Sequence, residues 1–255
     1  MLKTPRLVPG RGALLAVVLT LLAPLAAVVA TAGPAQAGPA FQQPRVGECR
    51  ALTFDALNRW SNNEAPIDCS EPHTSRVIAT GRLPRGVGWG ASDRQLNRIA
   101  TDICDPAWKT ALGSTYRGRA MTAYSWGWFI PTKAQRERGA RWIRCDVILY
   151  GGRSLVRLPT DDEPALGAQP HPNGIAACLK ARTFIHTVCA RRHAWRATGT
   201  FVMRQKAYPT DREARRAALR RCPSRTTGSF AWRYRGVYQW RAGDHVVVCY
   251  SHTRR

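Results

Sequence analysis

Apolar and polar residues alternate along the chain in short runs that are typical of strands. Strands are predicted where aromatic and β-branched residues gather between turn-forming residues, with a shorter strand around the first cysteine of each half. The predicted strands cover residues 77–79, 124–130 and 142–150, and then 200–202, 230–238 and 245–250. The chain therefore contains the same kinds of element twice, in the same order.

One longer run with helical spacing occurs in each half. Ser92 and Thr210 each stand three positions before Gln or Glu, which is the pattern of a capping box at a helix start. A proline, Pro106 or Pro223, stands just beyond the cysteine that closes each run. Because proline lacks an amide proton and collides with the preceding turn, each helix is predicted to end near that cysteine.

The two halves align as copies of one unit. Residues 81–104 align without gaps with 199–222, and residues 128–145 align in the same way with 232–249. A shared register over separated blocks indicates an internal repeat. The predicted fold class is α+β, with two tandem disulfide-stapled repeats, each a small antiparallel β-sheet (β-β-α-β-β) covered by one helix.

Four parts are predicted along the chain. Residues 1–37 have the basic start, the apolar stretch and the small final residues of a signal peptide, and the uncharged stretch is also long enough for an uncleaved N-terminal anchor. Residues 38–155 are the first domain, and residues 176–255 are the second, strongly basic repeat. The acidic, proline-rich residues 156–175 are the linker. Either fate of the N-terminal segment places the body outside the cytoplasm, secreted or tethered to the membrane.

The eight cysteines all follow the predicted signal, and an even number in an oxidising compartment favours disulfides. The first two cysteines are much closer together in the second copy than in the first. Such a length change is tolerated best in a hairpin loop whose base is clamped, so the first two cysteines of each copy are predicted to pair, as are the last two. The predicted pairs are Cys49–Cys69, Cys104–Cys145, Cys178–Cys189 and Cys222–Cys249.

The formal net charge of +23 is concentrated in the second half. Residues 176–255 contain 18 Lys and Arg against 3 Asp and Glu, whereas residues 38–155 contain 17 against 10. An exported protein rarely meets nucleic acid, so no nucleic-acid partner is predicted. The charge favours an anionic cell-envelope polymer or a phospholipid surface, or it serves solubility. An envelope or division protein is the other kind of partner considered.

Two cysteine–histidine pairs have a spacing that suits a metal ligand pair or a nucleophile and its base. Cys69 precedes His73, and Cys189 precedes His193, by the same interval. A disulfide leaves no thiolate for either role, so the histidines are predicted to make structural hydrogen bonds. No zinc-protease, hydrolase, phosphate-loop or dinucleotide motif occurs in the sequence. No catalytic residue, metal site or cofactor is therefore predicted.

Aromatic strands are the remaining candidate surface. Trp128 and Trp232 each lie on a strand face that carries a second aromatic residue two positions away. Such a face can stack on sugars, but in a small domain it is the more natural core. Together with His73 and His193, these two tryptophans are the structural or possible binding residues.

Several separated motifs resemble the septum formation domain of actinobacterial envelope proteins. They are Val46-Gly47-Glu48-Cys49, Cys69-Ser70-Glu71-Pro72-His73, Cys104-Asp105-Pro106, Trp128-Phe129-Ile130-Pro131-Thr132 and Gly139 through Arg144-Cys145-Asp146. The second half is a degenerate copy, in which Arg235 stands where the first half has Pro131. The resemblance implies an exported or membrane-tethered protein associated with division or the envelope, and it implies no reaction. The predicted function is noncatalytic binding or scaffolding at the cell surface or septum, with an exported cell-wall hydrolase as the alternative.

Overall fold

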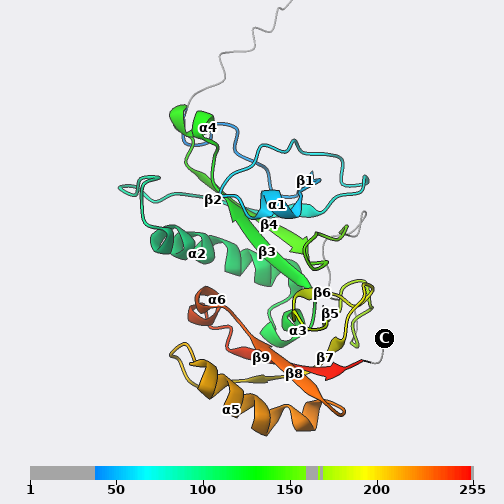
Figure 1. Cartoon of the computed structure of the whole chain (residues 1–255). Coiled ribbons are helices and arrows are strands. Elements are labelled where there is room, and N and C mark those ends of the chain that lie inside the picture. The colour runs from blue at the N-terminus through cyan, green and yellow to red at the C-terminus, as the bar shows by residue number, and fades with distance from the viewer. Residues whose placement is uncertain (1–37, 159–165, 167–168, 254–255) are drawn as a thin grey trace, which may run out of the picture. The chain divides into compact units, whose positions relative to one another are not determined.

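The computed structural model describes residues 38–158, 166 and 169–253. The predicted signal or anchor lies outside these residues, as does part of the predicted linker. Across the described residues the fold is α+β, with two antiparallel sheets and six α-helices (Figure 1). No helix in this part of the chain is both long and apolar enough to cross a membrane.

The first sheet has the strand order β1-β2-β4-β3. Helix α2 lies over one face of this sheet, and three short helices lie in the connections (Figure 1). The strands are β1 (Cys49–Arg50), β2 (Ser75–Arg82), β3 (Tyr124–Phe129) and β4 (Trp142–Leu149). The helices are α1 (Phe54–Leu57), α2 (Asp93–Leu112), α3 (Tyr116–Ala120) and α4 (Lys133–Glu137).

The second sheet has the order β6-β5-β7-β9-β8, so its part β5-β7-β9-β8 follows the same path as the first sheet. Its additional strand β6 was not predicted. The strands are β5 (Ala177–Leu179), β6 (His186–Val188), β7 (Trp195–Val202), β8 (Phe230–Tyr234) and β9 (Val246–His252). The helices are α5 (Asp211–Arg221), a 3₁₀ turn (Pro223–Arg225) and α6 (Val237–Arg241).

The strand register corrects one part of the sequence alignment. In the first sheet Ala79 lies opposite Cys145, and in the second sheet Gly199 lies opposite Cys249. The structural counterpart of Gly199 is therefore Ala79, and the gapless alignment of Gly81 with Gly199 is wrong by two positions. The connection from strand to helix is two residues longer in the first half, and a sequence comparison alone does not locate that difference.

The prediction that the first helix ends near Cys104 is wrong. Helix α2 continues through Pro106 to Leu112. Proline leaves the carbonyl of Asp102 without its helical partner, but Asp102 and Pro106 are both exposed, so water can reach that carbonyl. Past the proline, Trp108 and Leu112 are buried in the largest core cluster of the first half. Burial of these two side chains outweighs the lost hydrogen bond.

The predicted strand over residues 230–238 is too long. Strand β8 ends at Tyr234, and helix α6 begins at Val237. The helix places Trp240, which is fully buried, edge-on against the rings of Tyr208 and Tyr234. Burial of this indole requires the chain to turn over the end of the sheet instead of continuing as a strand.

The capping sequences act as helix starts in both halves. At Thr210 both hydrogen bonds of the capping box are present. At Ser92 the hydroxyl accepts from the amide of Gln95, but the described Gln95 side chain makes no return bond. A second complete box, which was not predicted, starts α4 at Thr132.

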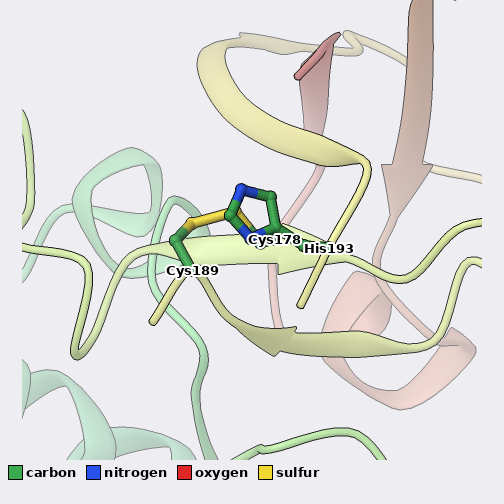
Figure 2. A group of neighbouring side chains, drawn as sticks. All are labelled: Cys178, Cys189 and His193. Atoms are coloured by element: carbon green, nitrogen blue, oxygen red, sulfur yellow. A yellow bond between two sulfur atoms is a disulfide. The ribbon is translucent and has the colours of Figure 1, made fainter. Parts of the chain in front are cut away.

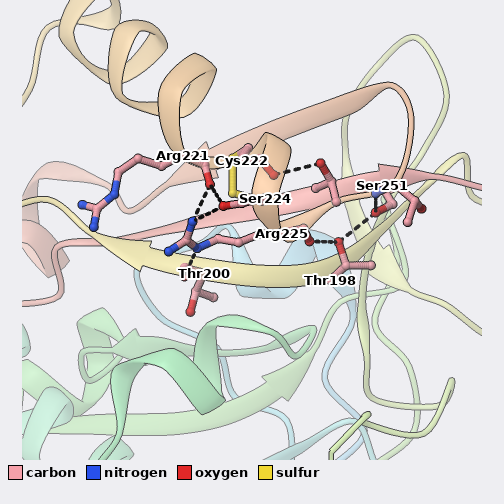
Figure 3. The surroundings of a disulfide bond; sticks show 10 residues. Thr198, Thr200, Arg221, Cys222, Ser224, Arg225 and Ser251 are labelled. Carbon is pink, nitrogen blue, oxygen red and sulfur yellow. Dashed lines mark hydrogen bonds between the residues drawn. A yellow bond between two sulfur atoms is a disulfide. The ribbon is translucent and has the colours of Figure 1, made fainter.

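Four disulfides staple the two sheets, and they are the four predicted pairs. None joins one sheet to the other. Figure 3 shows how the second helix is held near Cys222: Arg225 donates from Nε to the carbonyl oxygen of Thr200 at 3.0 Å, and Thr198 donates to the carbonyl oxygen of Arg225 at 2.9 Å. The 3₁₀ turn after α5 is therefore bonded to the central strand β7.

The sheet faces that point away from α2 and α5 also carry buried core residues, which a two-layer model does not predict. In the first sheet this face is covered by the chain between Cys49 and Cys69, whose Leu52 and Ala56 pack on Phe129 and Ile148. In the second sheet it is covered instead by α3, whose Ala120 packs with Ala231 and Val248 among others. The two halves thus share a core.

Two backbone bridges and a side-chain hydrogen bond also join the halves. Thr122 pairs with Ala176, and Gly151 pairs with Thr187, as isolated antiparallel bridges. The hydroxyl of Tyr116 donates to the carbonyl oxygen of Ala242 at 2.8 Å. The described residues from 38 onward belong to one compact unit. Independent folding of residues 38–155 and 176–255 stays a prediction.

Candidate ligand cavity between the two sheets

The two predicted histidines occupy equivalent structural positions. His73 and His193 are buried just before β2 and β7. Nδ1 of His73 lies 2.9 Å from the carbonyl oxygen of Glu71, and Nδ1 of His193 lies 2.8 Å from that of Arg191. A carbonyl only accepts, so each Nδ1 carries the proton and donates. Each histidine closes a turn before a strand, which is a structural role.

His193 also lies beside a disulfide. Among the described residues, one group has metal-ligand atoms gathered within 4.8 Å of one another: Cys178, Cys189 and His193 (Figure 2). The two sulfurs are bonded to each other. Because a metal is held by thiolates, this arrangement does not provide the sulfur ligands of a zinc site.

The two predicted tryptophans face the helices. Trp128 packs in the cluster under α2, with Leu96 and Ile143, and meets the ring of Trp60 edge-on at 5.1 Å. Trp232 packs in the cluster under α5. Both indoles are parts of the core, so these strand faces do not form an open sugar-stacking platform.

The described residues line an open cavity of about 450 Å³ that sequence reasoning did not find. It lies on the face of the second sheet opposite α5, where both halves contribute walls. The polar and aromatic side chains that line it include Phe54, Ser125 and Tyr150 from the first half and Phe184, His186, Arg233, Arg235, Gln239 and Tyr250 from the second.

A difference in loop length accounts for the cavity. The first two cysteines are 20 residues apart in the first half and 11 apart in the second. The longer loop carries α1 and fills the face of its own sheet. The shorter loop cannot do so, and α3 covers only part of the corresponding face of the second sheet.

Arg233 and Arg235 provide positive charge in the cavity. Arg233 lies in β8 and Arg235 just after its last residue, and both line the cavity. Nε of Arg235 donates to Oδ2 of Asp244 at 2.8 Å, whereas no described carboxylate forms an ion pair with Arg233. Phe129 and Pro131 occupy the aligned positions of the first half, so these charges belong to the second half alone.

The other polar groups of the cavity are neutral at physiological pH. Burial, followed by the charges of Arg233 and Arg235, lowers the pKa of His186 from 6.5 to about 3. Burial raises the pKa of Tyr250 to about 12. Nε2 of His186 is buried and has no hydrogen-bond partner among the described atoms. An unpaired buried imidazole nitrogen is costly, and a ligand in the cavity can satisfy it.

A buried cation, Arg119, stands next to this region. Its side chain is fully buried, it donates to the carbonyl oxygen of Gly113, and its guanidinium lies 4.8 Å from the centre of the Tyr116 ring. Burial lowers the pKa of Arg119, and the charges of Asp244 and Asp105 oppose that shift. Because Asp244 comes from the second half, the charge balance of α3 depends on contact between the halves.

These features define a disulfide-bonded α+β protein with an open basic cavity to which both halves contribute walls. A family model described as septum formation matches residues 87–249, a span that starts before α2 and ends in β9. The chain belongs to this septum formation family. No curated protein and no solved structure matches it. The family and the four disulfides fit a role in cell division or the envelope, outside the cytoplasm.

Proposed function

We propose that this is a noncatalytic exported protein that binds an anionic phospholipid surface, at the cell surface or the division septum, through the outer face of α5. The observation that carries the proposal is the composition of that face. Its exposed side chains include four arginines, Arg212, Arg215, Arg216 and Arg220. No described carboxylate forms an ion pair with any of them, so their charge is available to anionic headgroups.

The equivalent helix of the first half provides a comparison. The aligned positions of α2 hold Arg94, Asn97, Arg98 and Asp102. Two arginines and one aspartate give these four positions of α2 a net charge of +1, whereas the four arginines of α5 give a net charge of +4. Each helix packs on its own sheet, so a helix in this position does not need four arginines on its outer side.

An exposed apolar residue favours lipid over a wall polymer. Leu219 lies within the arginine face, four positions after Arg215, and is 51% exposed. A helix that presents arginines around a leucine can place the leucine at the acyl boundary while the guanidiniums contact headgroups. A wall polymer offers anionic groups without such an apolar layer.

We also propose that the two halves are repeats of one domain, with residues 156–175 as the linker, and that the basic second repeat has become the binding half. The matching strand order of the two sheets and the equivalent disulfides support this. Secretion, or tethering by residues 1–37, would place the protein on the outer side of the membrane.

The alternative function is that of an exported cell-wall hydrolase. Incubating the purified protein with cell-wall sacculi and, in parallel, with vesicles containing phosphatidylglycerol distinguishes lipid binding from hydrolysis. We expect salt-sensitive pelleting with the vesicles and no release of soluble fragments from the sacculi. Fragment release that persists after repurification would overturn the noncatalytic proposal. Stronger pelleting with sacculi than with vesicles would replace lipid by wall polymer as the partner.

A further inference from the structure

We propose that the cavity between the two sheets is a binding site for a small phosphate-bearing molecule. This site is separate from the lipid-binding face of the proposed function. Helix α5 packs on one face of the second sheet, through Ala217 and Ala218, whereas the cavity opens on the other face, lined by Val248 and Tyr250. The proposal for one site can therefore be disproved while the proposal for the other stands.

Charge selects an anion for the cavity. Of its two guanidiniums, that of Arg235 is paired with Asp244, while that of Arg233 has no carboxylate partner among the described residues. Arg233 makes one long hydrogen bond, 3.4 Å from Nη1 to the carbonyl oxygen of Phe184. Four of its five N–H donors thus remain for a ligand, in the planar arrangement that suits phosphate oxygens.

Neutral donors extend the anion site. Nε2 of His186 is buried without a partner, and Tyr150 and Gln239 also line the cavity. A phosphoryl group can accept from a guanidinium and from neutral donors at the same time, because it has three or more oxygens available. A carboxylate has two oxygens and would leave more of these donors unsatisfied.

The walls indicate that the ligand carries an organic part. The ring of Phe54 meets that of Tyr150 edge-on at 6.5 Å, and the Tyr150 ring lies 6.0 Å from that of His186. Phe184, which also lines the cavity, is 45% exposed and stacks on Trp195 at 5.9 Å. A volume of about 450 Å³ falls in the range of small-molecule sites and exceeds the needs of a phosphate ion alone. A ring-bearing phosphate ester fits both the charge and the walls.

The test is calorimetric titration of the purified protein at constant ionic strength with phenyl phosphate, inorganic phosphate, phenol, and dihexanoyl phosphatidylglycerol below its micelle concentration. We expect phenyl phosphate to bind, phenol to bind very weakly, and Arg233→Gln to weaken phenyl phosphate binding by about tenfold or more, as loss of a charged hydrogen-bond donor should. Arg233 is exposed, so this variant should keep its thermal unfolding midpoint.

Matched controls separate the two sites. A variant with the four α5 arginines changed to Gln should bind phenyl phosphate normally while it loses vesicle binding, and Arg233→Gln should show the reverse. If phenyl phosphate binds and dihexanoyl phosphatidylglycerol does not, the ligand of the cavity is a soluble phosphate ester. If the lipid also binds, and its binding depends on Arg233, the ligand is a lipid headgroup. A second readout on the unmodified protein is the ¹⁵N signal of the His186 ring, which should move on addition of phenyl phosphate.

No binding by any phosphate compound, or equal binding by Arg233→Gln with an unmoved His186 signal, would overturn the proposal.

Discussion

Arg144 and Asp146 form an ion pair that is almost completely enclosed, with Nε of Arg144 2.8 Å from Oδ1 of Asp146 and side chains that are 2% and 0% exposed. Both leave the face of β4 that the loop between Cys49 and Cys69 covers. Arg144 also donates to Oδ1 of Asn62 at 3.0 Å, and its guanidinium lies 4.5 Å from the centre of the Phe129 ring. The pair therefore connects this loop to the sheet. Val248 and Tyr250 occupy the aligned positions in the second half, where the loop is short.

This enclosure predicts an asymmetric response to substitution. Asp146→Asn should lower the free energy of unfolding by about 3–5 kcal/mol, because it leaves the guanidinium of Arg144 buried without a counter-charge. The double variant Arg144→Met/Asp146→Leu should lose clearly less, since two apolar side chains remove both desolvation costs. Urea unfolding followed by tryptophan fluorescence measures both. Equal losses in the single and double variants would contradict the ion-pair account.

The depressed pKa of His186 predicts loss of stability in mild acid. In the unfolded chain this imidazole takes up a proton as pH falls below about 6.5, whereas in the folded protein its pKa is about 3. Protons then favour the unfolded state, so stability should fall by up to about 2 kcal/mol between pH 7 and pH 5. His186→Gln should flatten that part of the curve. His252→Gln, an exposed control, should not; a flattening of equal size in both variants would assign the effect elsewhere.

The uninterrupted course of α2 predicts that Pro106→Ala is stabilising. Alanine restores the amide that can donate to the carbonyl of Asp102 and removes the steric clash of proline inside a helix. Because Pro106 is exposed, no packing is lost, and an increase of about 1–3 kcal/mol in the free energy of unfolding is expected. A decrease would indicate that the proline is needed for the packing of Trp108 and Leu112. Thermal and urea unfolding provide the measurement.

Removing the disulfide between helix and strand in either half should destabilise the whole protein. Cys104→Ala/Cys145→Ala and Cys222→Ala/Cys249→Ala each release a link between a helix and a last strand, from the middle of α2 in the first half and from the end of α5 in the second. A loss of about 2–4 kcal/mol is expected for each, mainly through the entropy of the unfolded chain. Peptide mapping of the unreduced protein checks the pairing itself. A bridge between the halves would exclude the present arrangement.

Local signals explain what the sequence could predict. The strand around Cys145 is rich in apolar and aromatic residues on both sides of the charged Arg144 and Asp146, and the hydroxyl residues Ser92 and Thr210 start their helices as expected. The cysteine pairs follow from one loop-length difference. The strands and helix starts depend on residues close in sequence. The disulfides could be predicted because four cysteines in each half allow only three pairings.

What the sequence could not predict depends on contacts at long range. The course of α2 past Pro106 is decided by burial of Trp108 and Leu112, and the short helix α6 by burial of Trp240. The cavity arises because a loop is short and α3 of the other half covers the exposed face incompletely. One sequence difference pointed to this cavity: the second half has Arg235 where the first half has Pro131. The alignment shows that difference, but it does not show where the arginine side chain lies.

The arginine face of α5 is expected to bind anionic lipid directly. The most direct measurement is cosedimentation of the purified protein with vesicles of phosphatidylcholine containing phosphatidylglycerol, over a series of salt concentrations. Changing Arg212, Arg215, Arg216 and Arg220 together to Gln should reduce binding at low salt by more than about tenfold, because each basic residue near the surface contributes about 1 kcal/mol. The matched control, Arg94→Gln/Arg98→Gln on α2, should bind as the unmodified protein does, and binding should weaken steeply as salt rises. Unchanged binding by the α5 variant, or binding that is indifferent to salt, would contradict the account.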